Sequence, residues 1–126
     1  MSDELSKLPP NVQERLLRLQ QLQQTLQSIL AQKQQVEMEK NEADQTLAEL
    51  AKTADEAVIY KAVGSLLVKA EKAKVTEELN ERKSLLDTRS TVIARQEERI
   101  KAQVKEAQTK LQEDLSPVAG QGQPLS

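Results

Sequence analysis

The chain has 126 residues, enough for one domain, and 18 Lys and Arg against 20 Asp and Glu give it a net charge of −2. It has no Cys, His, Phe or Trp, which excludes disulfides, thiolate metal sites and nucleophiles that depend on His or Cys. Its Leu, Val, Ile and Ala stand among many Gln, Glu and Lys, a balance typical of long helices with a narrow apolar seam. We therefore expect a helical protein that is not an enzyme and needs no cofactor or metal.

Dispersed charges and short apolar runs limit what the chain can bind. Acidic and basic residues are interspersed along it, so no basic block can neutralise phosphates and we expect no nucleic-acid binding. The start, MSDELSKLPP, lacks the apolar segment of a signal peptide, and no apolar run approaches the ~20 residues that span a bilayer. These features predict a cytoplasmic protein that does not bind membranes.

The first predicted helix covers residues 12–52 and follows a polar leader, residues 1–11. Two prolines disfavour helix before Asn11, which can act as the N-cap, with Glu14 three residues later as in a capping box. Apolar side chains then recur mostly at steps of three or four, which places them on one stripe of the helix. This predicted seam consists of Val12, Leu16, Leu19, Leu22, Leu26, Ile29, Val36, Ala43, Leu47, Leu50 and Ala54.

Two irregularities interrupt this seam. Leu16, Leu19 and Leu22 follow one another at two successive steps of three, which breaks the heptad pattern once. Lys33 and Lys40 occupy seam positions farther along. The pattern therefore predicts an imperfect coiled coil.

Residues 58–69 differ in character from the helical segments on either side. The β-branched and aromatic run Val58–Val63 precedes Gly64 and Ser65, and a second apolar run, Leu66–Lys69, follows. Two such runs joined by a two-residue turn predict a β-hairpin, with glycine where a positive φ is needed. The alternative is a buried helical patch that one glycine interrupts, and the β-branched residues favour the hairpin.

A second helix is predicted over residues 75–115. Its seam contains Leu79, Leu86, Ile93 and Ile100 at intervals of seven, followed by Val104, Ala107, Leu111 and Leu115. The companion seam positions are weak, because the pattern assigns them to Arg82, Arg89 and Gln96. A proline ends the helix, and the uncharged tail of residues 116–126 is predicted to be disordered.

The predicted fold is mainly α: a long antiparallel two-helix coiled coil with a central β-hairpin, formed as one domain by residues 12–115. The helices match in length, each ~60 Å at about 1.5 Å per residue. An isolated hairpin is marginal in water, and this one is apolar on both faces with open edges that template further pairing. We therefore expect it to join an inter-subunit β-barrel with hairpins of other chains. This hairpin surface consists of Val58, Ile59, Tyr60, Lys61, Val63, Gly64, Leu66, Leu67 and Val68.

A second candidate surface lies where the coil ends, far from the hairpin in the predicted fold. The end turns of a coil have few neighbours and can splay, which would offer apolar side chains to non-specific ligands. From the residues alone, a role in the coil core is the favoured interpretation. This terminal cluster consists of Val12, Leu16, Leu17, Leu19, Leu22, Val104, Leu111 and Leu115.

The segment VIYKAVGSLLVK, residues 58–69, closely resembles the hairpin of β-class prefoldin subunits of the archaeal type, YK-x-VG-x-LLVK. The PP-x-VQ start and QKQQVE centre of the first helix, and RQEERIK at residues 95–101, resemble the two arms of that family. The similarity covers roughly residues 9–115. The hairpin motif is specific, whereas a Gln-rich coil would not be.

The resemblance implies a place in a heterohexamer of two α-class and four β-class subunits, whose hairpins form a β-barrel platform. In that family the coiled-coil tips hold unfolded proteins without ATP and deliver them to a group II chaperonin. Carried over to this sequence, the hairpin surface mediates assembly and the terminal cluster forms the client-binding tips.

Two other functions fit a helical coiled-coil protein. One is a structural scaffold or tether with a single defined partner, which binding to chemically unfolded proteins would distinguish from a chaperone. The other is a small tubulin-handling or nucleic-acid-associated protein, and strongly salt-dependent DNA binding would favour the latter.

Overall fold

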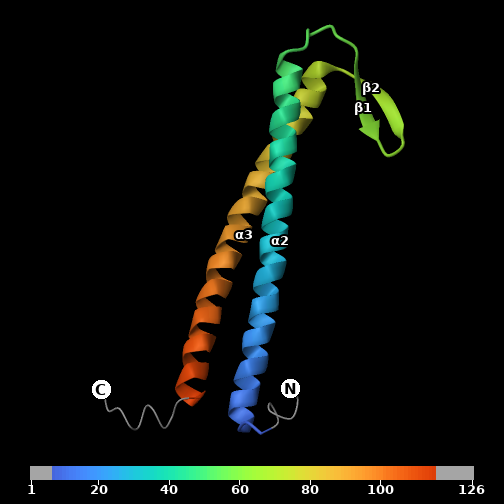
Figure 1. The fold of residues 1–126 in the computed structure, drawn as a ribbon. Coiled ribbons are helices and arrows are strands. Elements are labelled where there is room, and N and C mark those ends of the chain that lie inside the picture. The colour runs from blue at the N-terminus through green and yellow to red at the C-terminus, as the bar shows by residue number, and fades with distance from the viewer. Residues whose placement is uncertain (1–6, 116–126) are drawn as a thin grey trace. The chain divides into compact units, whose positions relative to one another are not determined.

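The computed structural model describes residues 7–115, which form two long helices with a two-stranded hairpin between them (Figure 1). The elements, in chain order, are helix α2 (Pro10–Ala51), strand β1 (Ile59–Val63), strand β2 (Leu66–Ala70) and helix α3 (Lys72–Leu115). They confirm the predicted mainly α fold with a central hairpin. The tail predicted to be disordered, residues 116–126, lies outside the described residues, as do the first six residues of the leader.

The chain packs as two compact units, and each contains one stretch of α2 and one stretch of α3. Among the described residues, the first unit combines residues 7–31 with residues 94–115, and the second unit consists of residues 32–93, which include the hairpin. Within each unit the two helices lie side by side and run in opposite directions (Figure 1). The antiparallel pairing predicted from the matched helices is therefore present in both units.

Helix α2 begins at Pro10, so the prediction that Asn11 caps it is wrong. The backbone oxygen of Pro9 accepts hydrogen bonds from the amides of Val12 and Gln13, both at 3.0 Å, so Pro9 is the N-cap. Proline suits the first helical position, because the N–H that it lacks would have no helical partner there and its fixed φ matches the helix.

The buried side chains form a single apolar seam along each helix, as the heptad pattern predicts. Leu86 is fully buried, and the regular spacing of seven on α2 is evident from Leu22 onwards. Ala54 is exposed because it lies beyond the end of α2. The buried apolar residues are Val12, Leu22, Ile29, Val36, Ala43, Leu50, Leu86, Ile93 and Leu111.

The companion positions on the seam of α3 were predicted in the wrong register. Arg82 and Arg89 are exposed, and Gln96 is only half-buried. From Leu79 the seam advances by four residues and then by three, whereas the prediction used the opposite order of steps. The side chains that turn toward α2 are therefore the next ones along the chain, Lys83, Ser90 and Glu97.

Cross-helix ion pairs involve two lysines at seam positions of the second unit, Lys40 on α2 and Lys83 on α3. Lys40 Nζ lies 2.8 Å from Asp87 Oδ1, and Lys83 Nζ lies 2.6 Å from Asp44 Oδ1. A further pair joins Glu39 to Arg82. Charged residues at seam positions add little stability when they are partly exposed, but they specify one register of the two helices.

The Lys40–Asp87 pair predicts a small loss of stability in acid. The hydrogen bond from Lys40 lowers the pKa of Asp87, so the pair stabilises the fold fully above the unfolded-state pKa, about 3.9. That contribution is lost as the pH falls through the lower pKa of the folded chain. Asp87→Asn should therefore reduce the fall in Tm between about pH 5 and pH 2, measured by circular dichroism.

The matched control for this prediction is Glu77→Gln. Glu77 is exposed in the same unit and has no ion-pair partner among the described residues. Its replacement should leave the pH dependence of Tm as it is in the unmodified chain. An unchanged acid profile in Asp87→Asn would contradict the assigned role of the pair.

The hairpin has the two-residue turn that the sequence predicts. Strands β1 and β2 pair antiparallel in a register that runs from Ile59 opposite Ala70 to Val63 opposite Leu66. Gly64 has φ of 60°, as the first central residue of a primed hairpin turn requires. A side chain at this position would be strained even though a Cβ atom would meet nothing within 4 Å.

Candidate functional site

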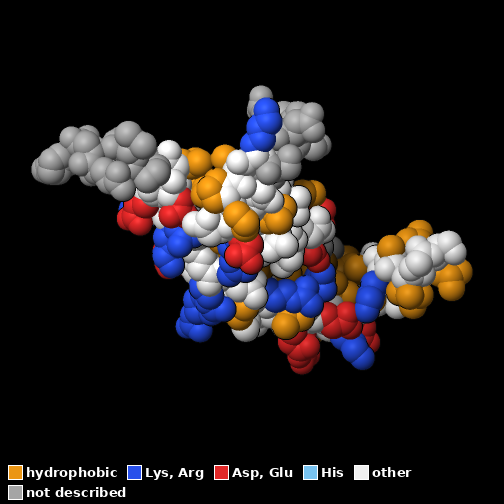
Figure 2. Space-filling view, turned by 90° about the horizontal axis from the view of Figure 1, so that it is seen from below, with side chains coloured by type: hydrophobic (Ala, Val, Ile, Leu, Met, Phe, Trp, Pro, Cys, Tyr) orange, Lys and Arg blue, Asp and Glu red, His pale blue; other side chains and the backbone are white. Residues whose placement is uncertain are grey.

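The hairpin surface is almost entirely uncovered in the isolated chain. Six of its large apolar side chains have exposed fractions from 46% for Val68 to 73% for Leu67, and of the nine residues only Ile59 is half-buried. Figure 2 shows the resulting cluster of hydrophobic side chains on the hairpin, at the right of the view. The exposed members are Val58, Tyr60, Val63, Leu66, Leu67 and Val68, with Lys61 and Gly64 among them.

Both faces of the hairpin carry apolar side chains, so neither face is the polar one that a sheet normally turns toward water. The register places Ile59, Lys61 and Val63 on one face with Leu66, Val68 and Ala70, and it places Tyr60, Ala62, Leu67 and Lys69 on the other. Each strand has one neighbour, so its outer edge offers free backbone donors and acceptors. Within residues 7–115 no other strand covers these faces or pairs with these edges.

Two ion pairs connect the hairpin region to the helices of its unit. Lys61 Nζ lies 2.7 Å from Glu78 Oε2, and this hydrogen bond lowers the pKa of the Glu78 carboxyl. Lys72 Nζ donates to the backbone oxygen of Thr53 at 2.7 Å and lies 3.2 Å from Asp55 Oδ1. These contacts span 17 to 19 residues, which is why no helical or strand spacing in the sequence indicates them.

A hollow of about 620 Å³ lies between one face of the hairpin and the start of α3. Val63, Val68 and Ala70 give it an apolar wall, and charged residues of the hairpin and α3 surround that wall. The Lys61–Glu78 pair therefore holds the hairpin beside α3 without filling the space between them.

The first unit brings the terminal cluster together, with most of it directed into the seam. Only two of the eight predicted residues are exposed, Leu17 and Leu115, each with an exposed fraction of 53%. Val12, Leu22 and Leu111 are buried, and the half-buried members are Leu16, Leu19 and Val104. In this conformation most of the apolar area would become available only if the helix ends part.

Arg15 links the two helices within this first unit. Its Nη1 atom lies 2.7 Å from Asp114 Oδ2 and donates to the backbone oxygen of Lys110 at 3.0 Å. The residues of this link are 95 and more positions apart in the chain, so sequence spacing could not indicate it. Both contacts oppose separation of the helix ends.

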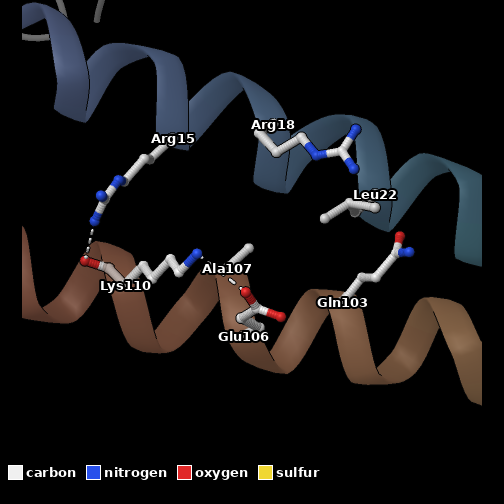
Figure 3. A pocket seen from close by; sticks show the side chains of 7 residues that line it. All are labelled: Arg15, Arg18, Leu22, Gln103, Glu106, Ala107 and Lys110. Atoms are coloured by element: carbon white, nitrogen blue, oxygen red, sulfur yellow. Dashed lines mark hydrogen bonds and ion pairs between the residues drawn. The ribbon is translucent and has the colours of Figure 1, made fainter.

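An open groove of about 410 Å³ lies between α2 and α3 in the first unit. Figure 3 shows Leu22 and Ala107 pointing into the space between the helices, while Arg15 reaches across to the backbone of α3. Lys110 pairs with Glu106 along α3 at 3.0 Å. The lining residues are Arg15, Arg18, Leu22, Gln103, Glu106, Ala107 and Lys110.

Neither a metal centre nor a transmembrane helix is found in the part of the chain that the structure describes. Residues 7–115 contain no group of three or more acidic side chains placed to hold a metal ion. No helix among them combines the length and the hydropathy needed to cross a bilayer.

Comparisons with known proteins agree on one family. The sequence model described as "Prefoldin subunit" matches residues 13–117. The chain is 46% identical to prefoldin subunit beta of Archaeoglobus fulgidus and 44% identical to that of Methanothrix thermoacetophila, and each alignment covers 92% of this chain and at least 97% of the relative. The crystal structure of the prefoldin beta subunit from Thermococcus strain KS-1 matches with a TM-score of 0.77 and 40% identity, over 86% of this chain and 96% of that one.

Proposed function

The chain belongs to the prefoldin family of chaperone subunits, which are not enzymes, and we propose that it is the β-class subunit of an ATP-independent holdase. In this proposal two α-class and four β-class chains form a cytoplasmic heterohexamer. The hairpin surface mediates assembly, the terminal cluster contacts unfolded proteins, and the complex transfers them to a group II chaperonin.

The observation that carries the proposal is the exposed, two-faced apolar hairpin. Each large apolar side chain left in water lacks the stabilisation of about 1.5–3 kcal/mol that burial would give it. A two-stranded sheet is only marginally stable by itself and does not offset this. A barrel completed by hairpins from other chains would bury both faces and pair both edges. The Lys61–Glu78 contact is compatible with this role, because it joins the hairpin to α3 and leaves the large apolar side chains uncovered.

The helix ends support weak, repeated contacts with clients. The apolar side chains Leu17 and Leu115 are exposed, and the seam residues beside them become accessible when the last turns fray. One such contact would be weak, but several subunits acting on the same unfolded chain gain avidity. This arrangement suits clients that share no sequence.

A paired truncation tests the client-binding role separately from assembly. Removal of residues 1–22 together with residues 104–126 shortens both helices at the same end and leaves the hairpin intact. We expect the truncated chain to assemble with an α-class subunit and to lose most of its ability to suppress aggregation of a chemically unfolded protein. Native mass spectrometry reports assembly, and light scattering reports suppression.

The full-length complex is the control for this truncation. Undiminished suppression by the truncated complex would contradict the client-binding role of the terminal cluster. A full-length complex that binds one folded protein tightly and ignores unfolded proteins would instead support the scaffold or tether.

A further inference from the structure

The groove in the first unit follows from a mismatch between the two seams. On α2, Leu16, Leu19 and Leu22 are separated by two successive steps of three residues. At 3.6 residues per turn, six residues fall about 120° short of two full turns, so the stripe swings around the helix here. An apolar stripe that shifts around its helix in this way cannot face a regular apolar stripe on the other helix along its whole length.

The seam of α3 shows no matching irregularity in this unit. Ile100, Val104, Ala107 and Leu111 follow at steps of four, three and four, the regular heptad order. The residue opposite the swing is Ala107, whose small side chain cannot fill the space. The open groove of about 410 Å³ is the result. Its apolar lining residues are the half-buried Ala107 and Leu22, which is only 5% exposed.

The residues that line this groove carry a net positive charge. Three of its lining residues are cations and only Glu106 is an anion. Arg15 is held by Asp114 at 2.7 Å, and Lys110 is held by Glu106 at 3.0 Å. Arg18 is exposed and has no ion pair or hydrogen bond with any described side chain, so its guanidinium is available to a ligand.

We propose that this groove binds segments of unfolded proteins in which an apolar side chain stands next to a carboxylate. The apolar side chain occupies the groove beside Ala107 and the small exposed part of Leu22, and the carboxylate pairs with Arg18. This inference rests on the proposed holdase function and gives it a preference among clients. The planar guanidinium can accept a carboxylate by two parallel hydrogen bonds, which favours an acidic side chain over other anions of less suitable shape.

The test uses the full-length chain assembled with an α-class subunit and three fluorescent peptides. The three peptides contain the same apolar residues. They differ only in the residue next to these, which is Glu in the first peptide, Gln in the second and Lys in the third. Because a solvent-exposed ion pair contributes little, we expect the Glu peptide to bind about two- to fivefold more tightly than the Gln peptide, with the Lys peptide weakest. Fluorescence anisotropy measures the three values of Kd.

Two substitutions that each remove one positive charge test whether Arg18 causes the preference for the Glu peptide. Arg18→Gln should make the Glu and Gln peptides bind equally, whereas Arg89→Gln, an exposed position outside the groove, should keep the difference. Ala107→Leu should weaken the binding of all three peptides, because it fills the groove without removing a charge. This last variant tests the site even if Arg18→Gln disturbs assembly.

The outcomes separate this inference from the proposed function. Equal affinity of the unmodified complex for all three peptides, or a Glu preference that survives Arg18→Gln, would overturn the inference. If the complex still suppresses aggregation in that case, the holdase function stands without it. If the unmodified complex neither binds the peptides nor suppresses aggregation, both the inference and the proposed function fail.

Discussion

A chain that carries both Tyr60→Glu and Leu67→Glu should fail to assemble with an α-class subunit. The two side chains lie on the same face of the hairpin and are exposed to 60% and 73% in the isolated chain. Each should contribute about 1.5–3 kcal/mol when buried in the barrel, and a buried, unpaired carboxylate adds a further penalty. The association constant should therefore fall by roughly a hundredfold or more, measured by native mass spectrometry over a dilution series.

The matched control places the same charges on apolar side chains outside the hairpin. Met38 and Val92 are exposed on the helices of the same unit, so Met38→Glu with Val92→Glu should assemble normally. Helical content by circular dichroism should match the unmodified chain in both double variants. Normal assembly of the hairpin variant would show that the hairpin surface is not part of the assembly interface.

Leu86→Ala should cause the largest loss of stability in the coil. Leu86 is fully buried in the seam of the second unit, and truncation of such a leucine costs about 2–5 kcal/mol, part of it from the cavity left behind. The neighbouring Leu85 is exposed to 48%, so Leu85→Ala provides the control, with an expected change below about 0.5 kcal/mol. Urea unfolding followed at 222 nm compares the two variants. Equal losses would show that the seam does not run through Leu86.

The sequence predicts the elements of this fold well, because each has a strong local signal. Intervals of seven identify buried Leu86 and Ile93, and the run before Gly64 identifies a strand and its turn. The exact start of α2 has no single local signal, because Pro10 and Asn11 are both typical of a helix N-terminus. Proline at the first helical position prevailed over asparagine as the cap.

The register of α3 was harder to predict, because polar residues alternate with apolar ones at the seam positions between Leu79 and Ile100. Arg82 and Lys83 both find a carboxylate across the interface, so their charge does not show which of them lies in the seam. Lys83 sits in the seam and pairs with Asp44, while Arg82 reaches Glu39 from an exposed position. Both pairings depend on how the two helices align, and the sequence of one helix does not specify that alignment.

The candidate surfaces could be predicted only in outline. The apolar hairpin is visible as a continuous run, but its contact with Glu78 depends on how the hairpin folds beside α3. The groove has a sequence signal, since the steps of three after Leu16 are visible without a structure. Its consequence depends on the regular seam of α3 and on Ala107 lying opposite, and neither follows from α2 alone.

Amide hydrogen exchange of the hairpin, measured before and after assembly with an α-class subunit, tests the central claim most directly. In a hairpin with a two-residue turn we expect the amides of Tyr60, Ala62, Leu67 and Lys69 to point away from the partner strand. These outward amides should exchange fast in the isolated chain and become strongly protected in the complex, as further strands pair with both edges. A complex that forms while these amides still exchange at the rate of the isolated chain would contradict assembly through the hairpin.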